Sequence, residues 1–236
     1  LYQLLSMKSM WAIHIIIFVK VELISEITEV QTSIVATGLL GKLGNKGAVG
    51  CSFVYRSVNR FAFVSSHLAA RVTRITERES NFVDIVSGLK LGGSDAVDFI
   101  HNFDHVFWMG DLNNRVDMGK HGTQKEFDKC VALSKQKRIS RLAPYDQLAV
   151  LMNGNYSVFT GFQEGEIKFP PTYRMERGVG QTWEYNNKKN QNPSWTDRVL
   201  WRSCQGKDGR VHLKEYNACH ELVQSDHRPV YASFMI

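Results

Sequence analysis

The chain has 236 residues, of which 43% are hydrophobic and 22% are charged. This length and composition suit one large globular domain with a sizeable core, and they exclude a protein that lies mainly within a membrane. The formal net charge of +6 favours an anionic partner, such as a phosphate compound, a nucleic acid or an acidic membrane surface.

The cysteines and the apolar stretches predict an intracellular protein. The four cysteines show neither Cys-x-x-Cys spacing nor the density of a disulfide-rich fold, which indicates reduced thiols. No secretory signal is recognisable. The apolar run Ile13–Val19 is too short to cross a bilayer and contains His14, so it is predicted to be a buried strand.

The first quarter of the chain is predicted to be mostly strands. Its expected elements are a helix at Tyr2–Lys8, strands at Trp11–Val21 and Ile34–Gly41 joined by a polar connection around Ser25–Thr32, and a turn at Gly44–Gly47 leading into strand Ala48–Tyr55.

Strands and helices follow one another in the rest of the chain. Apolar residues at helical spacing predict helices at Thr76–Leu91, Thr123–Lys137 and Tyr145–Met152. The predicted strands are Arg60–His67, His105–Met109, Trp195–Ser203, Val211–Tyr216 and Pro229–Ile236. A polar surface loop is expected at Gly178–Asn192, and no internal repeat or linker divides the domain 1–236.

A candidate site begins where the strand His105–Met109 ends. After the break at Gly110 come Asp111 and Asn113, and a spacing of two residues in extended chain places both side chains on one face. Gly, Asp and Asn also form turns, so this stretch alone is explained equally well by a turn.

Five distant segments favour a functional site over a simple turn. They fall at strand ends or in the loops after them, which is where an α/β fold gathers functional side chains. The segments are Gly44-Asn45-Lys46-Gly47, Ser66-His67-Leu68, Pro170-Pro171-Thr172-Tyr173-Arg174, Pro193-Ser194-Trp195-Thr196-Asp197-Arg198 and Ser225-Asp226-His227-Arg228-Pro229-Val230.

Together these segments resemble the catalytic domain of the inositol polyphosphate 5-phosphatases, whose fold is shared with DNase I and the abasic-site endonucleases. The Trp-x-Gly-Asp-x-Asn-x-Arg and Pro-x-Trp-x-Asp-Arg-x-Leu blocks of that family are both present and in its order. The resemblance runs from about Leu4 to the last residues. It implies a four-layer α/β sandwich of two packed, mostly antiparallel sheets flanked by helices.

The family resemblance also implies a segment before Leu1, with an Asn and the glutamate that holds magnesium. Glu22, Glu26 and Glu29 do not match the position of that glutamate. The sequence is therefore expected to be an N-terminally truncated or naturally incomplete domain. Mg²⁺ is the implied cofactor, and Asp226 is the expected metal residue.

The same resemblance assigns catalytic roles to five residues. Asp111 is expected to orient and deprotonate the attacking water, and Asn113 to donate a hydrogen bond to the water or the phosphate. His227 is expected to be a cation beside the phosphoryl group, with Asp197 fixing its tautomer. His67 matches a family histidine that hydrogen-bonds the scissile phosphate.

Further residues are expected to bind substrate. The backbone amides of the Gly44–Gly47 turn and the Lys46 ammonium suit a phosphate, although the same glycines are explained by a hairpin turn. At Thr196 many members of the family have Cys, and no catalytic role is expected there. The complete set of predicted substrate-binding residues is Asn45, Lys46, Tyr173, Arg174, Lys189 and Arg198, of which Tyr173, Arg174 and Lys189 match contacts to a 4-phosphate.

The resulting hypothesis is Mg²⁺-dependent hydrolysis of the 5-phosphate of PtdIns(4,5)P2, PtdIns(3,4,5)P3 or soluble inositol polyphosphates. The enzyme is expected in the cytoplasm, peripheral to the cytosolic face of membranes, with no nucleic-acid partner. Sequence features resemble both SHIP-type members and another lipid-preferring branch, so the subfamily stays open. The alternatives are a phosphodiesterase of the same superfamily, such as a nuclease or sphingomyelinase, and a headgroup-binding module without turnover.

Overall fold

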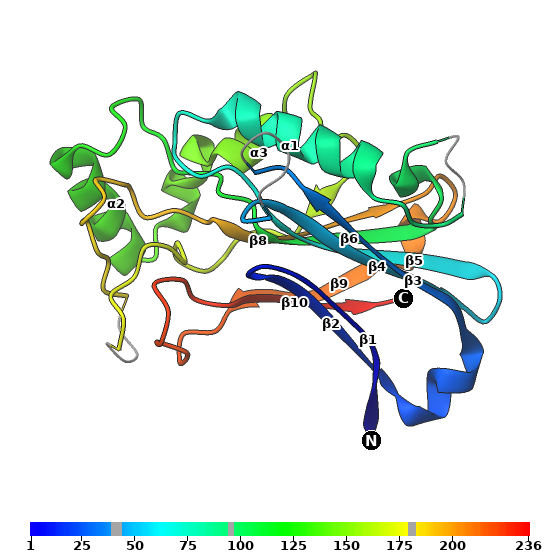
Figure 1. The fold of residues 1–236 in the computed structure, drawn as a ribbon. Coiled ribbons are helices and arrows are strands. Elements are labelled where there is room, and N and C mark those ends of the chain that lie inside the picture. Colours follow the sequence, from blue (N-terminus) through cyan, green and yellow to red (C-terminus); the bar gives the residue numbers. More distant parts are fainter. Residues whose placement is uncertain (39–43, 94–96, 179–182) are drawn as a thin grey trace.

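The computed structural model describes residues 1–236 except 39–43, 94–96 and 179–182. Its largest element is a six-stranded sheet in the order β3-β4-β5-β6-β8-β7. Two antiparallel hairpins, β1–β2 and β9–β10, lie on one face of this sheet (Figure 1). The strands are β1 (Tyr2–Met10), β2 (Ile13–Lys20), β3 (Ile27–Ala36), β4 (Gly47–Tyr55), β5 (Asn59–His67), β6 (His105–Asp111), β7 (Gln163–Glu164), β8 (Asp197–Ser203), β9 (His212–Ala218) and β10 (Val230–Met235).

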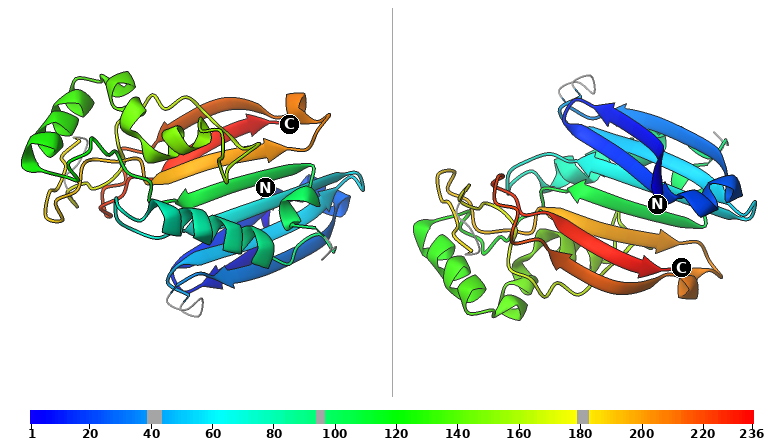
Figure 2. Two further views of the ribbon diagram at one scale, coloured as in Figure 1. Left: turned by 90° about the horizontal axis from the view of Figure 1, so that it is seen from above. Right: turned by 90° about the horizontal axis from the view of Figure 1, so that it is seen from below.

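Helices cover the opposite face of the sheet (Figures 1 and 2). Helices α1 (Ile75–Gly88) and α3 (Gln147–Met152) lie on this face, and α2 (Gln124–Lys135) lies beyond one end of the strands. Short 3-10 helices occur at Val21–Glu26, Phe99–His101, Ile139–Arg141, Ala143–Tyr145 and Asp208–Arg210.

The predicted α/β sandwich of mostly antiparallel strands is confirmed. Among the named strands only β5 and β6 pair in parallel. The second sheet is present as two separate hairpins. Within the described ranges the outer face of β1–β2 has no helix over it, and Leu4, Met7 and Phe18 are exposed there.

Strand β6 is the centre of the molecule because its side chains are buried on both faces of the sheet. Trp108 packs toward the helices against Phe82, with ring centroids 4.5 Å apart. The preceding residue, Phe107, points to the opposite face, toward the hairpins. Its ring centroid lies 5.0 Å from that of Phe234. This alternation with a period of two holds the C-terminal end of β6 in a fixed place.

Two sequence predictions in the first quarter of the chain were wrong. Tyr2–Lys8 was expected to be a helix but lies within strand β1, which pairs with β2 from Tyr2–Lys20 to Met10–Ile13. A short segment with mixed apolar and polar residues is compatible with both the helical period and the strand period. Here, pairing with the apolar strand β2 makes it a strand. The supposed connection Ser25–Thr32 is mostly strand β3, whose polar residues are compatible with its position at the sheet edge.

The other predicted helices and strands are present, with ends that differ by a few residues. Strand β7 was not predicted, and parts of two expected elements (residues 39–41 and 179–182) lie outside the described residues. The cysteines Cys51, Cys130, Cys204 and Cys219 are free thiols. In the described portion of the chain, helices long and apolar enough to span a bilayer are absent.

Candidate active site

Three predicted catalytic residues lie side by side across adjacent strands. His67 at the end of β5 is paired with Asp111 at the end of β6, and Asp111 is paired with Asp197 at the start of β8. Residues opposite each other in a sheet point to the same face. The sheet therefore places one histidine and two carboxylates in a row, as the sequence predicted for a common site.

The backbone at the end of β6 depends on Gly110. This residue has φ +126°, and a Cβ atom there would collide with the Ser66 carbonyl oxygen of the neighbouring strand. A side chain is strained in this conformation, so glycine is required. Asn113 also has positive φ, at +56°, and the chain bends there so that its amide turns back toward Asp111.

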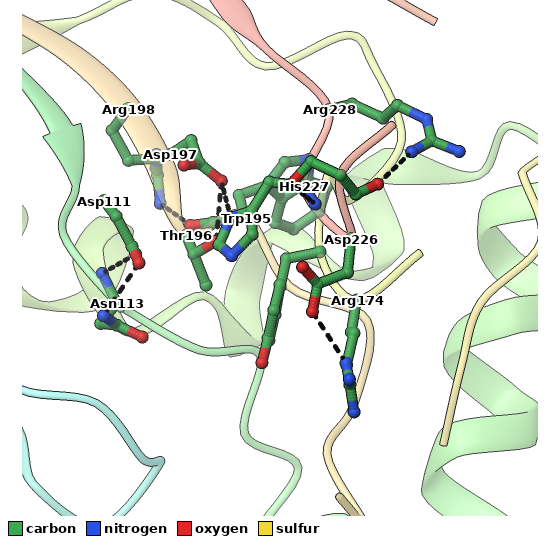
Figure 3. Close-up of polar contacts among 12 residues, drawn as sticks. Asp111, Asn113, Arg174, Trp195, Thr196, Asp197, Arg198, Asp226, His227 and Arg228 are labelled. Atoms are coloured by element: carbon green, nitrogen blue, oxygen red, sulfur yellow. Dashed lines mark hydrogen bonds and ion pairs between the residues drawn. The ribbon is translucent and has the colours of Figure 1, made fainter. Parts of the chain in front are cut away.

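Asn113 holds the Asp111 carboxylate in position. Its backbone N–H donates to Asp111 Oδ1 at 3.0 Å, and its side-chain Nδ2 donates to Asp111 Oδ2 at 3.1 Å and to the Leu68 carbonyl at 3.0 Å (Figure 3). Only 2% of Asn113 is exposed. The prediction that Asn113 donates to water or phosphate is corrected, because its amide hydrogens are already used to orient Asp111.

Basic groups lie on the other side of Asp111. His67 Nε2 is 3.1 Å from Asp111 Oδ2, and the Lys46 ammonium contacts the same ring nitrogen. Burial acts to raise the pKa of Asp111, but the hydrogen bond from His67 and the charges of His67, His227 and Arg115 outweigh it and leave this pKa below its ordinary value. Asn45, next to Lys46, is exposed at the rim.

His227 and Asp197 form the predicted pair. His227 Nδ1 lies 2.7 Å from Asp197 Oδ2 (Figure 3). Burial acts to lower the pKa of His227, but the Asp197 hydrogen bond and the charges of Asp197, Asp111 and Asp226 raise it above 6.5. The structure thus supplies a carboxylate that favours the imidazolium.

Thr196 has a direct contact with this pair that the sequence interpretation did not expect. Its hydroxyl donates to Asp197 Oδ2 at 2.9 Å and lies 3.4 Å from His227 Nδ1. Asp197 Oδ2 therefore accepts two hydrogen bonds at once. Thr196 therefore contacts the Asp–His pair directly, and the expectation that it has no catalytic role stays a prediction.

The segment after the two prolines crosses the site beside His227. Tyr173 exchanges backbone hydrogen bonds with Ser194, and its ring centroid is 4.4 Å from that of His227. Arg174 Nε donates to Asp226 Oδ2 at 3.0 Å, and Arg177 donates to Asp226 Oδ1 at 2.8 Å. Of the Arg174 guanidinium nitrogens, only Nε has a hydrogen-bond partner among the described residues.

Asp226 does not match its predicted role as a metal residue. Burial acts to raise the pKa of Asp226, but hydrogen bonds from Arg177 and Arg174 dominate and lower it to about 2. Both carboxylate oxygens are held by these arginines, and the side chain faces Arg174 in Figure 3. The structure therefore assigns Asp226 to orienting Arg174.

Lys189 lies in a loop that is tied to the same segment. The Asn186 backbone N–H donates to the Arg174 carbonyl at 2.9 Å, and Gln191 accepts from the Tyr173 hydroxyl at 3.4 Å. Lys189 itself is exposed between these two anchors. Its ammonium therefore extends from a loop whose two ends are fixed beside Tyr173 and Arg174.

Arg198 cannot contact a substrate, which corrects its prediction as a substrate-binding residue. Its side chain is 0% exposed. One guanidinium nitrogen pairs with Asp146 Oδ2 at 2.9 Å and another with Glu164 Oε2 at 2.6 Å. Breaking one arm of such a buried network leaves an uncompensated charge, so Arg198 fixes β8 against α3 and β7.

The described residues do not form a metal site on their own. Among them, no group of three or more His, Cys, Asp or Glu side chains is arranged to hold an ion. The carboxylates of the site are paired with basic side chains instead, namely Asp111 with His67, Asp197 with His227, and Asp226 with arginines. Mg²⁺ prefers oxygen ligands together with water and substrate phosphates, and each of these carboxylates already accepts hydrogen bonds from protein side chains.

The strand ends of this α/β sandwich bring together an oriented carboxylate, an Asp–His pair and a lysine, an arrangement that suits a phosphoesterase. Residues 1–233 match the family model described as endonuclease/exonuclease/phosphatase family 2. The chain belongs to this family.

Curated relatives within the family carry phosphatase names. Phosphatidylinositol 3,4,5-trisphosphate 5-phosphatase 2 of Mus musculus is 37% identical over 242 residues, which cover 100% of this chain and 18% of that protein. Phosphatidylinositol 3,4,5-trisphosphate 5-phosphatase 1 of Xenopus laevis is 35% identical over 244 residues, covering 100% and 23%. The chain thus spans about a fifth of the length of these two relatives.

Solved structures show the same fold with different ligands. The inositol polyphosphate 5-phosphatase domain of SPsynaptojanin, in complex with inositol (1,4)-bisphosphate and calcium ion, is 34% identical with a TM-score of 0.83, covering 99% of this chain and 62% of that chain. The A21V mutant of Cimex nitrophorin in a ferrous NO complex is 25% identical with a TM-score of 0.73, covering 99% of this chain and 74% of that chain. The fold alone therefore does not determine the activity.

Proposed function

We propose that this chain hydrolyses the 5-phosphate of phosphoinositides or soluble inositol polyphosphates. The observation that carries the proposal is the row His67–Asp111–Asp197 across three strands, with His227 bound to Asp197. The names of the similar proteins support the same chemistry. With a phosphoinositide as substrate, the protein acts in the cytoplasm as a peripheral protein at the cytosolic face of membranes.

The site residues have two roles in the reaction: one orients the attacking water, and the others stabilise negative charge. Asp111 is ionised at neutral pH because its pKa is lowered, so it accepts a hydrogen bond from the attacking water. A carboxylate of low pKa is a weak base, and its main contribution is to orient that water. The imidazolium of His227 and the Lys46 ammonium stabilise negative charge on the phosphoryl oxygens.

A divalent metal, proposed to be Mg²⁺, belongs to this function by resemblance to the family. When bound, Mg²⁺ neutralises phosphate charge and the leaving oxygen. Among the described residues, no group of three or more His, Cys, Asp or Glu side chains is arranged to hold it.

Arg174 is proposed to select substrates that carry a 4-phosphate. Arg174→Ala is expected to lower kcat/KM for such substrates by roughly ten- to hundred-fold, equivalent to about 1.5–3 kcal/mol for a charge-assisted contact. Analogues without a 4-phosphate should lose much less. Steady-state kinetics on a matched pair of headgroups, with and without this group, measures the difference.

Arg177→Ala is the matched control for Arg174→Ala. Arg177 contacts the same Asp226 carboxylate, but its side chain is 66% exposed. If loss of the ion pair to Asp226 caused the lower kcat/KM of Arg174→Ala, then Arg177→Ala would show the same loss. Equal losses on both substrates for Arg174→Ala would instead leave Arg174 a structural residue.

A headgroup-binding module without turnover is the second candidate function. It is favoured by the absence, among the described residues, of a carboxylate group arranged for a metal. This module would bind an inositol phosphate without releasing phosphate.

One panel assay separates the candidates. Phosphate release from inositol phosphate monoesters and cleavage of phosphodiesters are measured with Mg²⁺ and with a chelator, beside headgroup binding by calorimetry. The proposal expects monoester turnover only with Mg²⁺. A rate of phosphate release that is unchanged by the chelator contradicts metal dependence. Cleavage of phosphodiesters supports a nuclease or sphingomyelinase. Headgroup binding without turnover supports the headgroup-binding module.

A further inference from the structure

Arg115 lies between the two halves of the site, and although it ends the Trp-x-Gly-Asp-x-Asn-x-Arg block, no role was predicted for it. Only 5% of this residue is exposed. Its Nε donates to the Asn113 carbonyl oxygen at 3.1 Å, and one terminal nitrogen donates to Asn113 Oδ1 at 2.5 Å. Arg115 therefore holds the Asn113 side-chain amide in place, and that amide in turn orients the Asp111 carboxylate.

The face of the same guanidinium contacts the other half of the site. It lies over the Tyr173 ring, 4.7 Å from the centroid. The Tyr173 ring in turn packs against His227, with centroids 4.4 Å apart. The remaining terminal nitrogen donates to Gln191 Oε1 at 2.9 Å, at the end of the loop that carries Lys189.

We propose that Arg115 is a positioning residue that sets Asp111 and His227 relative to each other. The planar guanidinium donates in its plane to Asn113 and Gln191 while its face stacks on Tyr173. Lysine cannot reproduce this combination, because its ammonium is a compact charge without a planar face. The kinetic part of this inference rests on the proposed function, whereas its geometry does not.

Arg78 provides a matched control within the same region. It is also buried, with 1% exposure, and it donates to the Asn114 side chain and to Gln147 Oε1. It makes no contact with Asn113, Tyr173 or Gln191 in the described portion of the chain. Arg78 shares an acceptor with the Arg115 backbone, because the Arg115 N–H donates to Gln147 Oε1 at 3.0 Å. Arg78→Lys therefore reports the cost of disturbing a buried arginine beside the same segment while the contacts of the Arg115 side chain are kept.

The kinetic test compares Arg115→Met, Arg115→Lys and Arg78→Lys at a temperature where thermal denaturation shows each to be folded. Both Arg115 variants are expected to lose kcat by about 10²-fold, with KM changing far less, because small misplacements of reacting groups have effects of this size. Arg78→Lys should lose thermal stability but keep kcat. Full recovery of kcat in Arg115→Lys would show that only the charge matters and would overturn the proposal.

An NMR measurement tests the geometry without turnover. The His227 ring-proton resonance carries the ring-current shift of Tyr173, and this shift should change in both Arg115 variants but not in Arg78→Lys. If neither Arg115 variant folds, Gln191→Ala removes one acceptor only and should move the resonance in the same direction. An unchanged resonance overturns the proposal. A changed resonance in a protein without phosphatase turnover supports the positioning role and contradicts the proposed function instead.

Discussion

Replacing Asp197 with Asn lowers kcat by about 10²–10⁴-fold, and His227→Ala lowers it by a similar factor. Asp197 Oδ2 is 2.7 Å from His227 Nδ1, and together with the charges of Asp111 and Asp226 it raises the pKa of the imidazole. An amide in place of the carboxylate neither fixes the tautomer nor stabilises the imidazolium. Because the two residues act as one unit, the double variant should be little slower than either single variant. Steady-state kinetics of the three variants measures this.

The pH profile gives an independent check on this pair. The active imidazolium is present below the raised His227 pKa and is lost as pH rises through it, so the alkaline limb of kcat/KM should lie above pH 6.5. Asp197→Asn should move that limb to lower pH. Thr196→Val is the control, because it removes one hydrogen bond to Asp197 Oδ2 at similar volume and should have a far smaller effect. If the loss of kcat in the Asp197→Asn, His227→Ala double variant equalled the product of the two single losses, Asp197 would not act through His227.

Asp111→Asn is expected to slow every substrate alike, by about 10²–10⁴-fold in kcat. Asp111 accepts two hydrogen bonds from Asn113 and lies 3.1 Å from His67 Nε2, and its proposed role concerns the scissile phosphate that all substrates share. The amide keeps the shape but removes the charge that orients the water. Kinetics on headgroups with and without a 4-phosphate measures this, and a loss confined to one substrate class would contradict the assignment.

The row His67–Asp111–Asp197 was predictable because its residues lie at strand ends. Gly110 and the two-residue spacing of Asp111 and Asn113 indicated a strand that ends in a site, and the family resemblance assigned roles to His67, Asp197 and His227. Sheet register then places His67, Asp111 and Asp197 in one row. Such residues are recognisable because local backbone geometry restricts their types.

What the sequence did not predict depends on contacts between distant segments. Arg198 was expected to bind substrate, but its partners Asp146 and Glu164 come from other parts of the chain and enclose it. Asp226 was expected at a metal, but Arg174 and Arg177 hold both its oxygens.

The prediction at Tyr2–Lys8 failed for a related reason. The segment has no strong period of its own, and tertiary pairing with β2 overrides its local preference. The contacts of Asn113 and Thr196 were likewise visible only once side-chain distances were known.

The position of the released phosphate tests the central claim most directly. Purified protein with Mg²⁺ is incubated with inositol 1,4,5-trisphosphate, and the product is identified by phosphorus NMR, with Asp111→Asn as the inactive control. The expected product is inositol 1,4-bisphosphate with one equivalent of inorganic phosphate. Release of the 1- or 4-phosphate, or bound trisphosphate that stays intact, would contradict the assignment of this chain as a 5-phosphatase.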